Sequence, residues 1–328
     1  MSEPVLQVKG LKTYYYTEEG VVPAVDGLDF EVEPGETFAI VGESGCGKSV
    51  TSLSILRLIP SPPGKIIDGE IIYHGQDLVK KSEREMRSIR GNDISMIFQE
   101  PMTSLNPVFT VGQQIGESFR FHQQMGKAEM LKKSIEMLRL VGIPEPGHVI
   151  NDYPNQLSGG MRQRVMIAMA LACNPKILIA DEPTTALDVT IQAQIMRLLK
   201  QLQEKMGTSI ILITHDLGIV AQIAKHVMVM YCGQAVEYSD VRSIYKNPLH
   251  PYTAGLLRSI PKLTDDDMEE LPSIPGMVPS PSEKLQGCRF APRCEKCGAR
   301  CKKEMPELVT LEDGRKVRCF LYEGGVEG

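Results

Sequence analysis

The residues best suited to chemistry form a glycine-rich stretch early in the chain, Gly42-Glu43-Ser44-Gly45-Cys46-Gly47-Lys48-Ser49. It fits the pattern G-x-x-x-x-G-K-[ST], follows an apolar run at residues 37–41 and precedes a helix-compatible segment at residues 49–58. Glycines let backbone N–H groups curve around phosphate oxygens, while Lys48 can neutralise the terminal phosphates and the Ser49 hydroxyl can ligate Mg²⁺. A plain glycine-rich turn is the alternative, and the Lys-Ser pair at this spacing disfavours it. The predicted nucleotide-binding residues of this phosphate loop and its exit are Gly42, Glu43, Ser44, Gly45, Cys46, Gly47, Lys48, Ser49 and Val50.

Two adjacent carboxylates follow a second apolar run, residues 177–180. Asp181 stands where a parallel strand would end, which is the position of an acid that orders Mg²⁺. Glu182, one residue further, could polarise the water that attacks a γ-phosphate, as a general base does. Alone, the pair could be a solvated turn, but together with the phosphate loop it predicts phosphoryl transfer to water.

The elements that must position these residues alternate between strand and helix signals. Apolar and polar residues alternate over residues 6–16, which predicts a half-buried strand in an antiparallel edge sheet. Short apolar runs at residues 176–180 and 209–214, like the run before the phosphate loop, predict strands buried in a parallel sheet. Residues 83–90 and 128–140 predict helices of a helical insertion. The sequence therefore predicts an α/β fold with a doubly wound core.

Composition changes past about residue 240, where prolines interrupt any long element. We predict a nucleotide-binding domain over residues 1–245, with a helical insertion at about residues 100–165, and a small C-terminal extension over residues 246–328. No internal repeat is visible, so a single nucleotide-binding unit is expected.

Charge and hydropathy narrow the function classes. The net charge of −5 disfavours a nucleic-acid partner, because sequence-independent binding to phosphates needs a dense basic surface. Residues 1–10 lack the basic and apolar stretches of a secretory signal. The longest apolar run, residues 166–173, falls short of the roughly 20 residues that span a membrane. We expect a cytoplasmic chain whose contact with a membrane goes through a partner.

Cysteines crowd the end of the chain. Of the 8 cysteines, Cys46, Cys173 and Cys232 are scattered, whereas the others lie in the tail. In a reducing compartment this crowding favours a metal site over disulfides. The tail cysteines are Cys288, Cys294, Cys297, Cys301 and Cys319.

The segment Leu157-Ser158-Gly159-Gly160-Met161-Arg162-Gln163-Arg164 resembles the signature sequence of ATP-binding-cassette (ABC) proteins, and it lies upstream of Asp181 as in that family. The resemblance implies a P-loop NTPase cassette with a RecA-like parallel-sheet core, an antiparallel β subdomain and a helical subdomain. It also implies that two cassettes dimerise head to tail, so that Ser158, Gly159 and Gly160 of one cassette face the nucleotide of the other.

Further positions are similar to other elements of this family. Gln99 resembles the Q-loop glutamine, which implies contact with the nucleotide and with Mg²⁺. The segment Thr185-Ala186-Leu187-Asp188 resembles the D-loop, which implies that Asp188 reaches a nucleotide, and His215 resembles the switch histidine, which implies catalysis together with Glu182. A surface glutamine and an ordinary histidine at a strand end are the alternatives for Gln99 and His215.

Tyr15 resembles the aromatic residue that stacks on adenine in ABC proteins. Its neighbours Tyr14 and Tyr16 leave the exact residue open, and packing in the core is the alternative reading of the whole group.

Two segments resemble one branch of the family, the ATPases of oligopeptide and dipeptide importers. They are Glu100-Pro101-Met102-Thr103-Ser104-Leu105-Asn106-Pro107 and Asn247-Pro248-Leu249-His250-Pro251-Tyr252-Thr253. The resemblance implies a peripheral subunit on the cytoplasmic side of the cell membrane that powers two integral-membrane permease subunits. It also implies a second, different ABC ATPase subunit and an extracytoplasmic peptide-binding protein. A soluble non-transport ABC ATPase, or an importer of nickel or sugars, is the alternative.

The tail is similar to the cysteine pattern by which this branch holds an iron–sulfur cluster. The resemblance implies a [4Fe–4S] cluster with a structural role, ligated by Cys288, Cys294, Cys301 and Cys319. The spacing Cys294-x-x-Cys297 also suits half of a zinc site, and free thiols are a third possibility.

Overall fold

The computed structural model describes residues 3–100, 104–185, 187–260, 273–280, 283 and 286–323. Residues 101–103 of the importer-like segment and Ala186 of the D-loop-like segment lie outside the described residues. Contacts divide the chain into two units. The first unit comprises Met1–Val5, Val32–Glu36 and Asp77–Ile213, and the second comprises Leu6–Glu31, Thr37–Gln76 and Thr214–Gly328.

The first unit contains a parallel sheet of short apolar strands. β6 (Ile94–Ile97) pairs with β7 (Ile177–Asp181), and β7 pairs with β8 (Ser209–Thr214). Every residue of β7 and β8 is buried, which is why both strands are continuous apolar runs without alternation. The predicted strands at residues 176–180 and 209–214 are confirmed to within one residue.

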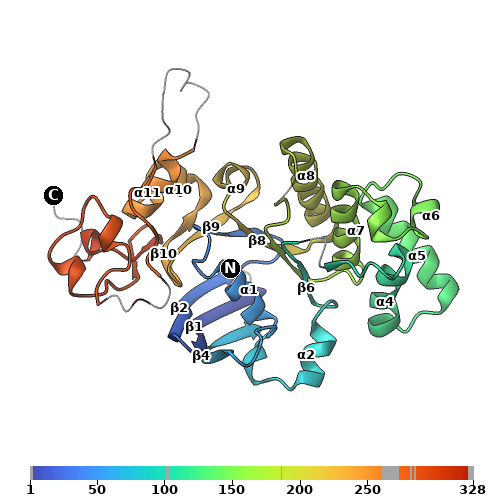
Figure 1. Ribbon diagram of the computed structural model, residues 1–328, viewed down its shortest axis with the longest axis horizontal. Helices are drawn as coiled ribbons and strands as arrows, with labels where there is room; N and C mark the ends of the chain where they lie inside the picture. Colours follow the sequence, from blue (N-terminus) through green and yellow to red (C-terminus); the bar gives the residue numbers. More distant parts are fainter. Residues whose placement is uncertain are drawn as a thin grey trace. The chain divides into compact units, whose positions relative to one another are not determined.

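Helices make up the rest of the first unit, and those labelled α4 to α7 gather in one cluster (Figure 1). Ser82 and Thr110 each begin a helix with a reciprocal capping box, which satisfies N–H groups of the first turn. Ile115 of α4 and Leu138 of α5 are fully buried. The helices predicted at residues 83–90 and 128–140 are confirmed. The elements are η1 (Leu78–Lys80), α2 (Glu83–Ile89), α4 (Val111–Gln123), α5 (Lys127–Leu140), α6 (Pro146–Val149), η2 (Pro154–Gln156), α7 (Gly159–Leu171) and α8 (Val189–Met206).

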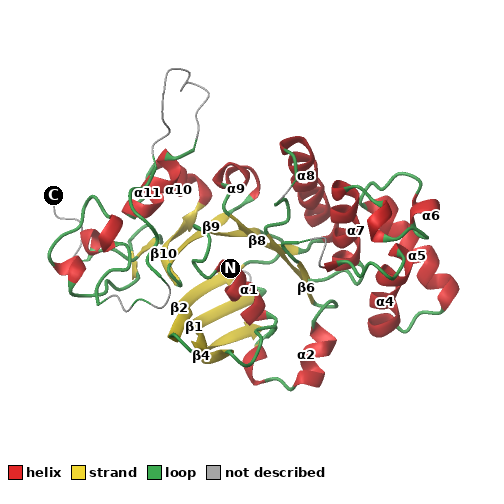
Figure 2. Ribbon diagram, in the orientation of Figure 1, coloured by secondary structure: helices red, strands yellow, loops and turns green. Residues whose placement is uncertain are grey.

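The second unit opens with the predicted antiparallel sheet, whose long strands lie side by side in Figure 2. Its strand order is β2 (Gly20–Val32), β1 (Leu6–Thr17), β4 (Gly64–Tyr73) and β5 (Gln76–Asp77). Leu6, Val8 and Leu11 of β1 are buried, so one face of this sheet belongs to the core.

A mixed sheet and the phosphate loop complete the core of the second unit. β3 (Thr37–Val41) leads through the loop into α1 (Lys48–Ile55) and runs parallel to β9 (His226–Tyr231). β10 (Gln234–Asp240) pairs antiparallel with β9. The remaining elements before the extension are α9 (Leu217–Ile223) and α10 (Val241–Lys246).

The C-terminal extension packs directly on this mixed sheet. Its short strand β12 (Lys316–Val317) pairs with β10, and β11 (Val309–Thr310) pairs with β12. Tyr231 of β9 forms an aromatic cluster with Tyr252 and Phe290, with ring centroids 4.7 to 5.4 Å apart. The domain boundary at residues 245 and 246 stays a prediction. The helices of the extension are α11 (Pro251–Arg258), η3 (Ala291–Arg293), η4 (Arg300–Lys302) and η5 (Phe320–Tyr322).

Within the described ranges, no helix combines the length and apolar character that crossing a bilayer requires.

Candidate nucleotide-binding site

The phosphate loop takes its shape from glycines that no other residue could replace without movement. Gly42 has a φ of 153° and Gly47 has a φ of 99°. A Cβ on Gly42 would lie 2.3 Å from the Met230 carbonyl oxygen, and one on Gly47 would lie 2.1 Å from the Ala24 carbonyl oxygen. Both glycines therefore let the loop approach neighbouring backbone closely while it adopts left-handed conformations.

Lys48 lies folded over this loop at the start of α1. Its Nζ donates to the carbonyl oxygens of Gly42 at 2.8 Å and Glu43 at 3.0 Å, and the residue is 5% exposed. These carbonyls hold the ammonium group beside backbone that can bind phosphate oxygens. Gly47 caps α1 without a side chain, so this helix start is suited to an anion.

In the first unit, two predicted site residues meet at the end of β7. Gln99 Nε2 donates to Glu182 Oε2 at 3.0 Å, and Thr185 Oγ1 donates to the same oxygen at 2.9 Å. Glu182 has a φ of 44°, which is unusual for a residue with a side chain and is common at functional sites. Asp181, the preceding residue, is 3% exposed.

The signature-like segment begins α7 and lies against the start of α8. Ser158 caps α7 through a hydrogen bond from the Met161 N–H at 3.3 Å. A Cβ on Gly160 would lie 3.1 Å from Ile191 of α8, so this close approach favours glycine. Asp188 accepts a hydrogen bond from the Ile191 N–H at 2.9 Å and caps α8.

The predicted site residues fall into two groups. Gln99, Asp181 and Glu182 belong to the first unit together with the signature-like segment. The phosphate loop belongs to the second unit, as does His215, an exposed residue directly after β8.

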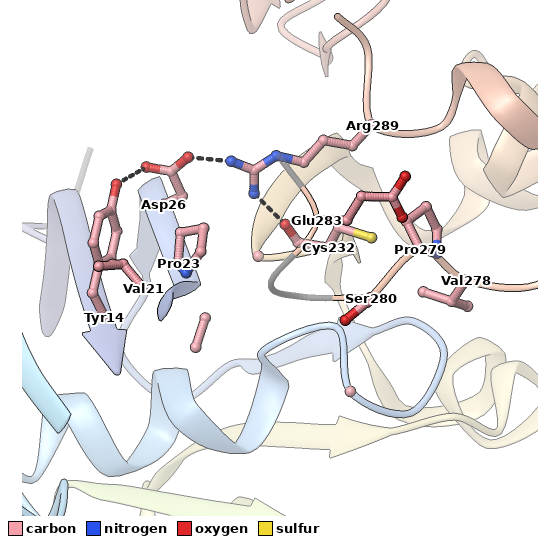
Figure 3. Close-up of a pocket in the computed structure, with 13 residues that line it drawn as sticks. Tyr14, Val21, Pro23, Asp26, Cys232, Val278, Pro279, Ser280, Glu283 and Arg289 are labelled. Atoms are coloured by element: carbon pink, nitrogen blue, oxygen red, sulfur yellow. Dashed lines mark hydrogen bonds and ion pairs between the residues drawn. The ribbon is translucent and has the colours of Figure 1, made fainter. Parts of the chain in front are cut away.

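A cavity of about 340 Å³ adjoins the phosphate loop within the second unit (Figure 3). Tyr14 forms part of its wall, and its hydroxyl donates to Asp26 Oδ1 at 2.8 Å. Burial, with this hydrogen bond, raises the pKa of Tyr14 to about 12, so the ring is a neutral phenol at physiological pH. The lining residues of this Tyr14 cavity are Tyr14, Val21, Pro23, Ala24, Asp26, Gly45, Cys232, Gly233, Val278, Pro279, Ser280, Glu283 and Arg289.

Tyr15, the residue predicted to stack on adenine, is half-buried and does not line this cavity. A Cβ on Gly64 of β4 would lie 3.0 Å from the Tyr15 ring. The hydroxyl of Thr13 is hydrogen-bonded to that of Ser54 in α1, at 2.8 Å. Because successive side chains of a strand point to opposite faces, Tyr15 lies on the same face as Thr13, and Tyr14 lies on the other face.

The C-terminal extension binds the phosphate loop through Glu43. The Arg293 guanidinium donates to both carboxylate oxygens of Glu43, at 2.7 and 3.0 Å, and its side chain is 5% exposed. The Glu43 N–H donates to the Tyr252 hydroxyl at 2.9 Å. The extension thus holds both the backbone and the side chain of this loop residue.

Comparison with known proteins assigns the family. The oligopeptide transport ATP-binding protein AppD of Bacillus subtilis is 55% identical over 319 residues, which are 97% of each chain. The chain belongs to the ABC transporter family. The family model described as "ABC transporter" matches residues 25–185 of this ABC ATPase, and the model described as "Oligopeptide/dipeptide transporter, C-terminal region" matches residues 236–301. The dipeptide transport ATP-binding protein DppD of Bacillus subtilis is 52% identical, covering 99% of this ATPase and 97% of DppD.

Solved structures confirm the predicted ABC cassette fold. The ATP-binding cassette MJ0796, in a dimeric post-hydrolysis state with ADP and Pi, is 30% identical, with a TM-score of 0.65. It covers 72% of this ABC ATPase and 99% of its own chain. CbiO1 from Clostridium perfringens is 28% identical, with a TM-score of 0.63, covering 75% of this ATPase and 92% of its own chain.

The predicted metal centre concerns four cysteines of the tail, all of which lie among the described residues. Cys288, Cys294, Cys301 and Cys319 line one cavity of about 210 Å³. However, within the part of the chain that the structure describes, no group of three or more His, Cys, Asp or Glu side chains is arranged to hold a metal ion. The prediction of a [4Fe–4S] cluster is therefore wrong, and the zinc alternative gains no support.

Sequence reasoning also missed residues that shape this site. Arg293 lies 250 positions from its partner Glu43 in the loop, and Arg289 lies 263 positions from its partner Asp26, so only the folded chain brings these residues together. The sequence leaves Tyr14 open beside Tyr15, and the strand period distinguishes the two from a buried Thr13, which places Tyr14 on the opposite face.

Proposed function

We propose that this ABC ATPase binds and hydrolyses ATP to drive a membrane importer of oligopeptides or dipeptides. The observation that carries the proposal is the match along nearly the whole chain, extension included, to transport ATP-binding proteins for these cargoes. An ABC ATPase without a transport partner, or an importer of nickel or sugars, is not favoured by these relatives.

ATP binding is assigned to the phosphate loop and the Tyr14 cavity. The loop N–H groups and Lys48 bind the phosphates. Hydrogen bonds to loop carbonyl oxygens place the Lys48 ammonium group at the loop, where its positive charge can neutralise the phosphates. We assign the stacking contact with adenine to Tyr14 rather than Tyr15, since Tyr14 shares a cavity with Gly45 of the loop. The oxygen donors of Ser49, Gln99 and Asp181 suit Mg²⁺, which when bound neutralises charge on the phosphates.

Hydrolysis is assigned to Glu182 as the general base. Hydrogen bonds from Gln99 and Thr185 orient its carboxylate, so little reorganisation is needed when it accepts a proton from water. His215 is proposed to contact the γ-phosphate as the switch residue. Ser158, Gly159, Gly160 and Asp188 would complete the site of a partner cassette in a head-to-tail dimer, as the dimeric state of MJ0796 suggests.

The complete transporter would place this chain at the cytoplasmic side of the cell membrane. It would bind two permease subunits and pair with a second, different ABC ATPase, while a peptide-binding protein delivers cargo from outside. A nucleic-acid partner is not expected, given the net charge of −5.

Uptake in cells tests this function. Deleting the gene should abolish uptake of a labelled pentapeptide or dipeptide, and the wild-type chain, but not Lys48→Ala, should restore it. Uptake of labelled nickel and of a sugar, measured in the same strains, serves as the control. Unchanged peptide uptake after deletion, or loss of nickel or sugar uptake instead, would contradict the assigned cargo.

A further inference from the structure

The Tyr14 cavity is built from two distant parts of the chain. Tyr14, Ala24 and Gly45 come from the antiparallel sheet and the phosphate loop, whereas Val278 and Arg289 come from the C-terminal extension. Figure 3 shows Tyr14 on one side of the cavity and Val278 on the other. An extension that served only to bind partners would not need to enclose space beside the phosphate loop.

We propose that the C-terminal extension supplies one wall of the nucleoside subsite, with Arg289 as the residue that positions and contacts the adenosine part of ATP. This inference rests on the proposed function, because it takes the phosphate loop to hold the triphosphate. It adds a role for the extension in binding ATP.

Arg289 is held at the cavity by a chain of polar contacts. Its guanidinium donates to the Asp26 carboxylate and to the Cys232 carbonyl oxygen. Asp26 in turn accepts the hydrogen bond from the Tyr14 hydroxyl at 2.8 Å. Figure 3 shows this relay from Tyr14 through Asp26 to Arg289. Arg289 therefore fixes the orientation of the Tyr14 ring as well as lining the cavity.

The guanidinium remains able to bind a ligand while it makes these contacts. Its contacts with Asp26 and Cys232 engage two of the five N–H groups that a guanidinium carries. The side chains of Arg289 and Asp26 are 15% and 20% exposed, so the charges are paired and partly withdrawn from water. A planar donor group fixed in this way can hydrogen-bond a ribose or stack on a base.

The position of the extension at the cavity is fixed by an independent anchor. Arg293 is the last residue of η3, four positions after Arg289, and its buried guanidinium forms a bidentate ion pair with Glu43 of the phosphate loop. The Tyr252 hydroxyl accepts a hydrogen bond from the backbone N–H of Glu43. Arg289 is therefore part of a preorganised wall, which lowers the entropy cost of binding.

The size of the Tyr14 cavity and the chemistry of its lining suit a nucleoside. The cavity of about 340 Å³ falls within the usual range of small-molecule sites. Apolar surfaces of Val21, Pro23 and Val278 can cover the faces of a base, and polar groups of Asp26 and Arg289 lie at its margin.

Binding measurements on the full chain test the proposal by separating the nucleoside from the phosphates. Isothermal titration calorimetry with Mg²⁺ would compare AMP-PNP, a non-hydrolysable ATP analogue, with inorganic tripolyphosphate, which has no nucleoside. Arg289→Ala should weaken AMP-PNP binding by about tenfold, the effect of losing one charge-assisted contact, and should leave tripolyphosphate binding unchanged. Arg258→Ala is the matched control, because Arg258 is an exposed arginine of the same extension that pairs with Glu295 and does not line the Tyr14 cavity. This control should change neither affinity.

Equal weakening of both ligands, or unchanged AMP-PNP binding, in Arg289→Ala would overturn the proposal. If the alanine variant does not fold, Arg289→Lys keeps a charge for Asp26 but loses the planar fork, and the same selective loss is expected. Wild-type protein that binds neither ligand would refute the proposed nucleotide site itself. Wild-type protein that binds both ligands equally well would refute only the nucleoside subsite.

Discussion

The side-chain amide of Gln99 donates a 3.0 Å hydrogen bond to the carboxylate of Glu182. These residues are 83 positions apart, and a donor from Thr185 reaches the same oxygen at 2.9 Å. These two hydrogen bonds hold the carboxylate in one orientation, so it can accept a proton from water with little reorganisation.

Replacing Glu182 tests this assignment directly. Glu182→Gln keeps the size of the side chain but removes its basicity, so ATP turnover should fall by about 10² to 10⁴ while ATP binding survives. Phosphate release and equilibrium binding of labelled ATP would measure the two effects separately. Hydrolysis at the wild-type rate would rule out Glu182 as the base.

The sequence was sufficient to predict the buried strands, whereas the chemistry assigned to the residues at their ends stays a prediction. β7 and β8 are apolar without interruption, and the glycine pattern of the phosphate loop has few other physical explanations. The partners of these elements were harder to predict, because no local pattern encodes a contact such as that between Glu43 and Arg293.

One prediction about the nucleotide site remains untested, and one about the tail was wrong. The assignment of adenine stacking to Tyr15 follows a family position and stays a prediction, although Tyr15 does not line the cavity that Tyr14 shares with Gly45 of the phosphate loop. The iron–sulfur prediction followed the resemblance of the tail to a cysteine pattern of the importer branch, whereas ligation depends on side-chain geometry that a sequence pattern does not determine.

Gly47 should be the least replaceable glycine of the phosphate loop. Gly47→Ala would place a methyl group 2.1 Å from a backbone oxygen at a φ of 99°, so the free energy of unfolding should fall by about 2–4 kcal/mol. Gly45→Ala is the control, because its φ of 77° is also unfavourable but its Cβ would meet no atom within 4 Å. This control should lose only about 1 kcal/mol. Urea denaturation measures both, and equal losses would contradict the steric explanation.

His250 should make the protein sensitive to acid. The residue is 1% exposed, and its Nδ1 accepts a hydrogen bond from the Tyr252 N–H at 3.1 Å at the start of α11. Burial lowers its pKa from 6.5 to about 3, so the unfolded chain takes up a proton at a higher pH than the folded chain does. Stability contributed by neutral His250 is therefore complete above about pH 6.5 and is lost as pH falls toward 3, at about 1.4 kcal/mol per pH unit.

A variant isolates this contribution from that of other titrating groups. His250→Asn retains a side-chain acceptor that can cap α11 but cannot take up a proton. Urea unfolding between pH 4 and pH 7 should show a shallower pH dependence in the variant, by about one proton. Identical slopes for the two proteins would show that His250 is not the acid-sensitive group.

The ion pair between Arg293 and Glu43 should couple the extension energetically to the phosphate loop. The Arg293 and Glu43 side chains are 5% and 29% exposed, and their ion pair is bidentate. A double-mutant cycle with Arg293→Ala and Glu43→Ala, measured on the free energy of unfolding, should therefore give a coupling energy of about 1–3 kcal/mol. The exposed pair Arg300 and Glu304 is the control, and it should show a much smaller coupling because both side chains are more than half exposed. If the two cycles give the same value, the Arg293 pair is only a surface contact, and the extension does not stabilise the loop through it.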